Sequence, residues 1–131
     1  MPIKYSLKKG HVFERQIAKE LTRILGVSFR RVPMSGAIHN FLEGDIMKMD
    51  NKLTIIDNTI LECKDCKTIK MPQWIKQVEE EAKRADTKKW ILFFKFNGIA
   101  RAVLNLDHLE HFLKLKLPKT VQTSLRTQAR A

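Results

Sequence analysis

The chain has 131 residues, of which 44% are hydrophobic and 30% charged, a size and composition that indicate one folded domain and exclude wholesale disorder. Its apolar runs are far shorter than the roughly 20 residues of a membrane span, and residues 1–6 lack the apolar segment of a secretory signal. Two cysteines cannot form a disulfide framework. We therefore expect a soluble, cytoplasmic protein with no membrane partner.

Basic residues exceed acidic ones, 25 against 14, and the formal net charge is +11. The first 40 residues hold eight Lys and Arg against two Glu, and the segment after Glu110 holds five Lys and Arg and no acid. A field of this sign favours polyanions, because cationic contacts with phosphates release condensed counterions. The same balance would also fit a merely soluble basic protein. A nucleic-acid partner is the better interpretation.

The first third of the chain predicts one helix, one strand and a loop. Apolar residues at 3.6-residue spacing indicate a helix over residues 8–25, which Gly26 ends. Residues 27–32 are rich in β-branched side chains and are bounded by Pro33, which indicates a strand. Residues 34–37 are expected to form a loop or bulge.

Three strand-like runs follow, over residues 46–49, 53–56 and 60–64. Turn-prone Asp-Asn dipeptides separate them at residues 50–51 and 57–58. The pairing register of these short runs stays open at this point.

The rest of the chain predicts two helices and a hairpin. The elements are a helix that begins at Pro72 and extends through Ala85, strands over residues 90–96 and 99–104 joined by an Asn97-Gly98 turn, and a last helix opened by a capping box at Asp107 and Glu110. Residues 115–131 have little apolar periodicity and are expected to form a basic, mobile tail. Helices interspersed with strands imply an α/β domain in which helices flank a mixed central sheet.

Two segments, at residues 44–46 and 61–64, place charged side chains within apolar strands. Glu62 and Lys64 are two residues apart and share one strand face, whereas Cys63 points the other way, where a small hydrophobe suits a core. Asp45 opens an apolar strand, in which a carboxylate is hard to justify as a core residue. If the strands pair so that Asp45 meets Glu62, two carboxylates and an ammonium group converge.

Such a convergence suits Mg²⁺, because hard carboxylate oxygens hold the ion, which polarises a phosphate and generates hydroxide. A nearby lysine can orient the attacking water and offset the charge that develops on the phosphate. The plainer alternative is that Asp45 caps a turn while Glu62 and Lys64 form a cross-strand surface pair. The basic chain around these residues favours the metal site.

Cys63 and Cys66 could also be combined with His108 and His111 as a zinc set. The histidine spacing is shorter than usual, and Cys63 would have to turn away from the core. Two unrelated thiols and a helix with two exposed histidines are the preferred interpretation. The aromatic side chains of the second half could stack on bases, yet core packing accounts for most of them.

Four motifs occur in series: KG-x-x-x-ER at residues 9–15, RVP-x-SG at 31–36, GDI at 44–46 and ECK at 62–64, followed by a helix that carries glutamines. This series resembles the archaeal-type (Hjc-type) Holliday junction resolvases of the PD-(D/E)XK nuclease superfamily. Phages encode similar proteins. The likeness runs from about Lys8 to Phe96. It implies a restriction-endonuclease-like fold and a single nuclease domain over residues 1–114, in a host cytoplasm if a phage encodes the chain.

By this resemblance, Asp45 and Glu62 would be metal ligands together with the backbone carbonyl of Cys63. Glu14 would complete the acidic site directly or through water, and Lys64 would position water or stabilise charge. The cofactor would be Mg²⁺, for which Mn²⁺ is expected to substitute, and no small-molecule cofactor is expected. The stretch between Asp45 and Glu62 carries an extra segment at residues 52–57 compared with archaeal members, so Asp57 is a rival for the aspartate role.

The same resemblance, together with the basic charge, assigns a set of DNA contacts. Arg15, Arg31 and Ser35 match family positions near the phosphate backbone, and Gln77 matches a supporting glutamine, for which Gln73 competes. The DNA-binding residues expected on these grounds are Lys9, Arg15, Arg30, Arg31, Ser35 and Gln77.

The function implied is Mg²⁺-dependent resolution of four-way DNA junctions by paired, symmetric phosphodiester hydrolysis. Because a junction offers two equivalent strands and one chain has one site, we expect a homodimer, with the hairpin at residues 90–104 as its seam unless the helices of one monomer cover both its faces. The alternatives are another structure-specific or restriction-type endonuclease, and a non-catalytic nucleic-acid-binding domain of the same fold. Intact Glu14, Asp45, Glu62 and Lys64 favour the enzyme.

Overall fold

The computed structural model describes residues 2–33 and 44–114, with side chains for residues 10–33 and 44–113. The elements are α1 (Pro2–Leu25), β1 (Phe29–Arg31), β2 (Ile46–Lys48), β3 (Thr59–Lys64), α3 (Met71–Arg84), β4 (Lys89–Phe96), β5 (Ile99–Val103) and α4 (Leu106–Lys114). The predicted loop at residues 34–37 and the predicted tail at residues 115–131 lie outside the described residues. None of the described helices is long and apolar enough to cross a membrane.

The described strands form two sheets. β1 and β2 pair antiparallel, and a second sheet has the order β3-β4-β5, in which β3 and β4 are parallel and β4 and β5 antiparallel. The parallel pair needs a crossover, which α3 supplies. The predicted α/β class with a mixed, helix-flanked sheet is therefore confirmed.

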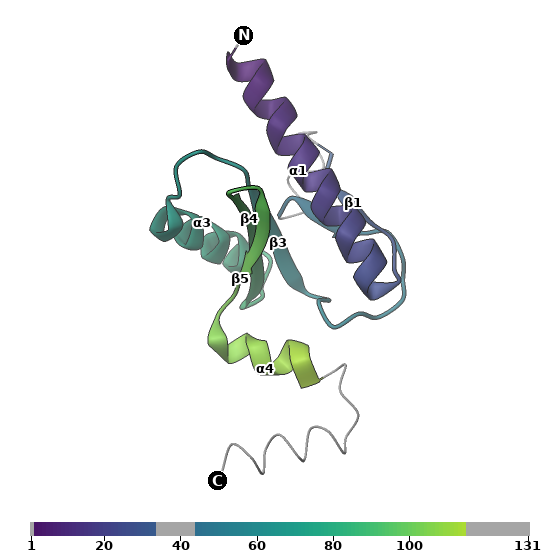
Figure 1. Ribbon diagram of the computed structural model, residues 1–131. Coiled ribbons are helices and arrows are strands. Elements are labelled where there is room, and N and C mark those ends of the chain that lie inside the picture. Colours follow the sequence, from purple (N-terminus) through teal and green to yellow (C-terminus); the bar gives the residue numbers. More distant parts are fainter. Residues whose placement is uncertain (1, 34–43, 115–131) are drawn as a thin grey trace.

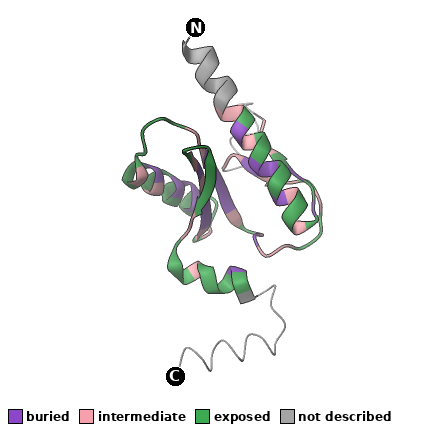
Figure 2. Ribbon diagram, viewed as in Figure 1, coloured by how far each residue is buried: buried purple, intermediate pink, exposed green. Residues whose placement is uncertain are grey.

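Two helices cover opposite faces of the three-stranded sheet (Figure 1). On one face α1 packs with Phe13 and Ile17 against Leu61 and Cys63 of β3. On the other face α3 packs with a stripe spaced four residues apart, formed by Trp74, Val78 and Ala82, against Ile60 of β3 and alternate side chains of β4. The inner faces of both helices and of the sheet are accordingly buried (Figure 2). The sheet thus separates two cores.

The predicted strand at residues 53–56 is wrong, because this segment forms a turn in which Leu53 is 90% exposed. Local hydrogen bonds replace strand pairing: the Thr54 hydroxyl donates to Asp57 Oδ1 over 2.9 Å, and the Ile56 amide donates to the Thr54 hydroxyl over 3.3 Å. Such side-chain hydrogen bonds compete with the backbone hydrogen bonds that would pair this segment with a neighbouring strand. Asp57 also accepts from Lys48 Nζ at 2.8 Å, which ties the turn to β2.

Two helices begin at other residues than the sequence predicts. α1 begins at Pro2, six residues before the predicted start. α4 begins at Leu106, so Asp107 lies in the first turn of the helix and is not its cap. The predicted hairpin turn is confirmed, since Asn97 and Gly98 have φ of 52° and 74°, both positive as a type I′ turn requires.

Gly44 precedes β2 at a point where the chain passes close to β3. Its φ is +87°, and a Cβ at this position would lie 2.9 Å from the Leu61 carbonyl oxygen. Residues that have a Cβ rarely adopt such a φ. The Leu61 carbonyl oxygen belongs to the backbone of β3, so it cannot rotate away as a flexible side chain could. Only glycine therefore lets the following residue, Asp45, approach β3.

We predict that Gly44→Ala lowers the free energy of unfolding by about 2–3 kcal/mol, through the combined cost of positive φ and the contact with Leu61. The matched control is Gly26→Ala, where φ is +70° but nothing lies within 4 Å of the added Cβ. This control should lose only about 1–2 kcal/mol. Denaturant titration measures both, and equal losses would contradict the close approach.

Candidate active site

Asp45 is fixed by hydrogen bonds to β3 and to Val32, the residue that follows β1. Its amide donates to the Leu61 carbonyl over 2.7 Å, and its carbonyl accepts from the Val32 amide over 2.7 Å. Its carboxylate oxygen Oδ2 accepts from the Cys63 amide over 2.8 Å. Asp45 therefore joins the two sheets. Because its partners Leu61 and Cys63 flank Glu62, its carboxylate is held beside Glu62.

Glu62 is 4% exposed and faces the carboxyl groups of Asp45 and Glu81 at hydrogen-bonding range. Burial raises the pKa of Glu62 far above its usual range, and the hydrogen bonds and negative charge of the two neighbouring carboxyls raise it further. Among the described residues, Oε2 of Glu62 and Oε2 of Glu81 have no hydrogen-bond partner. Three carboxyl groups therefore gather at the buried edge of β3.

Lys64 lies on the same face as Glu62, as the strand alternation predicts, and Cys63 lies in the core on the α1 side. Lys64 Nζ donates to Gln77 Oε1 over 2.7 Å, and Gln77 Nε2 donates to Glu81 Oε1 over 3.1 Å. Hydrogen bonds thus link half-buried Lys64 of β3, through Gln77, to the buried carboxyl of Glu81 on α3.

Glu14 of α1 and Arg31 of β1 also lie near Asp45. Arg31 Nε donates to Glu14 Oε2 over 3.1 Å. Burial raises the pKa of Glu14, the charge of Asp45 adds to this, and Arg31 opposes it. Burial lowers the pKa of His11, and the positive charges of Arg31 and Arg15 lower it further. Arg31 Nη2 is buried without an acceptor among the described residues, so one donor of the guanidinium is unused.

The other residues predicted to belong to the site differ in their surroundings. Arg30 is exposed, whereas Arg31 is half-buried beside Glu14. The rival aspartate, Asp57, pairs with Lys48, away from Glu62. Gln77, and not Gln73, contacts Lys64. Ser35 lies outside the described residues, and the side chain of Lys9 is likewise not described.

Sequence reasoning missed Glu81. Its position carried a signal, since it lies three residues after Val78 and next to Ala82, on the apolar stripe of α3. A carboxylate on a buried helix face is uncommon unless it has a partner. Pairing it with Glu62 requires knowing which strand α3 crosses, and that information is not local in sequence.

The carboxyl groups fit a divalent cation. A buried acid with an unpaired oxygen beside two further carboxyls is poorly compensated by the protein alone, and a hard cation supplies the missing charge. Asp45 and Glu62 would hold it. No three His, Cys, Asp or Glu side chains in the described ranges form a group suited to hold a metal ion. Mg²⁺ commonly binds through one or two carboxylates and keeps several waters, so such a group is not required.

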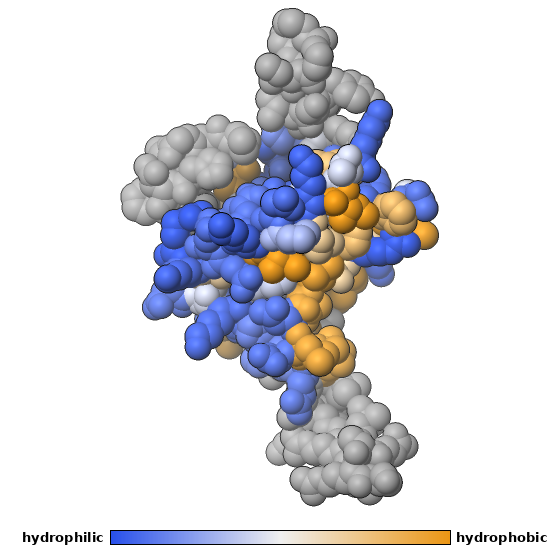
Figure 3. Space-filling view, turned by 90° about the vertical axis from the view of Figure 1, so that its left-hand side faces the viewer, coloured by the Kyte–Doolittle hydropathy of each residue, from blue (hydrophilic) through white to orange (hydrophobic). Residues whose placement is uncertain are grey.

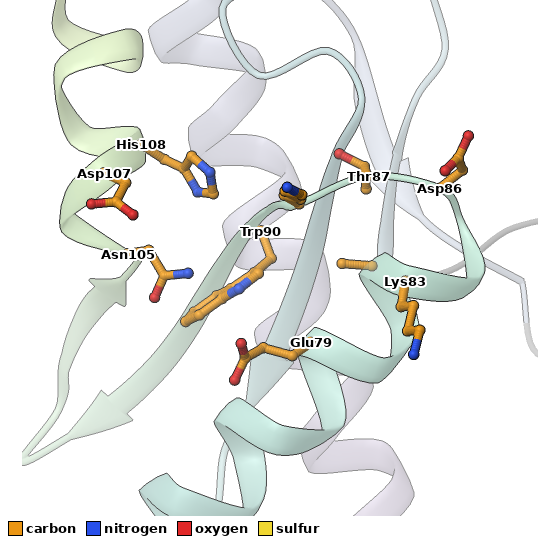
Figure 4. A pocket seen from close by; sticks show the side chains of 10 residues that line it. Glu79, Lys83, Asp86, Thr87, Trp90, Asn105, Asp107 and His108 are labelled. Carbon is orange, nitrogen blue, oxygen red and sulfur yellow. The ribbon is translucent and has the colours of Figure 1, made fainter.

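Figure 4 shows a separate hollow of about 580 Å³, whose lining includes none of these residues. Its walls come from the end of α3, the start of β4 and the start of α4, and include Lys83, Trp90 and His108. The parallel strands β3 and β4 begin at this end of the sheet, whereas Glu62 and Lys64 lie toward the other end. The hollow is not the candidate site.

The α/β fold, with helices on a mixed three-stranded sheet, is that of the restriction-endonuclease-like PD-(D/E)XK nucleases, and Asp45 lies against β3 beside Glu62 and Lys64. Residues 5–129 match the family described as "Phage putative PDDEXK endonuclease", and the chain belongs to this family. The match confirms the predicted PD-(D/E)XK superfamily and a phage family. It does not specify the predicted subtype, the Holliday junction resolvases. Members of the superfamily generally depend on divalent metal ions. Neither a curated protein nor a solved structure matches the chain.

We predict that the stability of the metal-free protein falls as pH rises. The folded-state pKa of Glu62 lies above its ordinary value of 4.5, so its stabilising contribution is complete below that pH and is lost above it. In EDTA, the free energy of unfolding should decline as pH rises above 5, because unfolding then releases the proton that the folded protein keeps on Glu62.

Glu62→Gln should flatten this decline, and the exposed Glu80→Gln is the matched control that should keep it. Thermal or denaturant unfolding from pH 5 to pH 9 measures both. Parallel curves for wild type and Glu62→Gln would contradict the burial of an uncompensated carboxyl.

Proposed function

We propose that the protein is an Mg²⁺-dependent endodeoxyribonuclease that acts on branched DNA and resolves four-way junctions. The main support for nuclease activity is the position of the Asp45 carboxylate, which accepts a hydrogen bond from the Cys63 amide and lies beside buried Glu62. Lys64 lies on the same face of β3 as Glu62. The family match supports endonuclease activity. The order of the four motifs from Lys9 to Lys64 supports the junction substrate by resemblance.

Each side chain has a role that its surroundings support. Asp45 and Glu62 would hold the cation, which when bound acts as a Lewis acid toward phosphate and lowers the pKa of its water. The Lys64 ammonium, which Gln77 holds, offsets charge that develops on the phosphate. The guanidinium of Arg31, which pairs with Glu14, adds positive charge that attracts a phosphate. The net charge of +11 strengthens the attraction of the backbone.

We predict that Asp45→Asn abolishes cleavage of a four-way junction in Mg²⁺, because the amide is a poor ligand for a hard cation. Junction binding should be preserved or strengthened, since one negative charge near the phosphate is removed. Asp57→Asn is the matched control, because Asp57 pairs with Lys48 and should leave the cleavage rate within about twofold.

Single-turnover cleavage and a binding titration measure both variants. Near-normal cutting by Asp45→Asn would contradict the placement of the site. Loss of cutting only in Asp57→Asn would assign the aspartate role to the rival residue.

We propose that two copies associate, so that two sites address opposing strands of a junction. Trp90 and Leu92 of the hairpin are buried against α3 of the same chain, so we place the seam at the hairpin tip instead. Phe96 and Ile99, at the hairpin tip, are 45% and 55% exposed. Further exposed leucines lie on α4, at positions 106, 109 and 113. From the α3 side, hydrophobic surface adjoins a mainly hydrophilic face (Figure 3).

Light scattering at micromolar concentration should therefore give about twice the chain mass of 15.3 kDa. Ile99→Lys should return the mass to that of one chain, because a charge would be buried in the seam. Lys95→Ala, on the same hairpin, is the control. A wild-type monomer that still makes paired cuts would contradict the dimer.

A further inference from the structure

Glu81 is a buried carboxyl that the roles above leave without a function. It lies on α3 and is 9% exposed, on the same helix face as Trp74 and Val78. Packing therefore fixes its position more firmly than those of Lys64, which is half-buried, and Gln77, which is exposed. Of the three side chains linked by hydrogen bonds, Glu81 is the anchored end.

The amide of Gln77 has two chemically different ends, and its two neighbours accept only one orientation. The Lys64 ammonium can only donate, and it meets Gln77 Oε1 at 2.7 Å. The Glu81 carboxylate accepts, and it meets Gln77 Nε2 at 3.1 Å. A flipped amide would place NH₂ against the ammonium and oxygen against the carboxylate. Glu81 thus selects the orientation that holds Lys64.

We propose that Glu81 is a positioning residue that acts through Gln77 to hold the Lys64 ammonium near the carboxyl pair of Asp45 and Glu62. This inference rests on the proposed nuclease function and adds a residue to it. Glu81 also borders Glu62, so the competing role is that of a cation ligand. The two roles require different chemistry at position 81: positioning requires a hydrogen-bond acceptor, whereas ligation requires a negative charge.

Two substitutions separate these roles. Glu81→Ala removes the acceptor and should lower the single-turnover cleavage rate about tenfold or more. Glu81→Gln keeps an acceptor oxygen and should restore the rate to within about threefold of wild type. Junction affinity and the half-saturating Mg²⁺ concentration should change little in either variant. Glu80→Ala, at the adjacent exposed position, is the matched control and should match wild type.

The double variant Gln77→Ala with Glu81→Ala should be no slower than Gln77→Ala alone, because both changes break the same chain. A readout independent of cleavage is the side-chain amide of Gln77 in nitrogen-15 NMR spectra. In wild type and Glu81→Gln its signals should show hydrogen-bonded shifts. In Glu81→Ala they should move to the positions of a solvated amide.

Three results would overturn the proposal. Glu81→Gln could be as slow as Glu81→Ala and need much more Mg²⁺, which would make Glu81 a cation ligand. Folded Glu81→Ala could cut as fast as wild type. The Gln77 amide of wild type could already have the signals of a solvated amide, a result that stands even if Glu81→Ala does not fold. Wild type that cuts no DNA would instead contradict the nuclease function, and the amide signals would still report whether Glu81 holds Gln77.

Discussion

The close approach of residues 44–45 to β3 is the constraint on which the site depends. Asp45 bonds through its amide and its carboxylate to backbone groups on both sides of Glu62, and through its carbonyl to Val32. These bonds join the two sheets, and Gly44 permits them because it has no side chain to meet the Leu61 carbonyl. The backbone therefore brings the carboxylates together before any cation contributes.

The same arrangement carries a cost that the rest of the fold must offset. Glu62 is buried beside two carboxyls, and burying such groups without full compensation opposes folding. Core packing on both faces of β3 holds the strand in place in spite of this cost. A protein selected for stability alone would have little reason to keep the cluster, whereas a cation-dependent site has one.

Local patterns predicted much of this fold, and long-range contacts decided the rest. Period-two alternation placed Glu62 and Lys64 on one face, and the apolar stripe of α3 located its buried side. The turn at residues 53–56 escaped prediction because Thr54 and Asp57 hydrogen-bond locally within a run of strand-like composition. The pairing of Asp45 with β3 was open because short strands carry little register information. Glu81 escaped because its partner lies on another element.

The most direct test is cleavage in Mg²⁺ of a mobile four-way junction beside duplex, flap and single-stranded DNA of matched sequence. We expect paired, symmetric cuts in the junction, at rates well above those on the other three substrates, and no cutting in EDTA. Equal cutting of duplex or flap DNA would contradict the junction substrate, and no cutting of any substrate would contradict the nuclease.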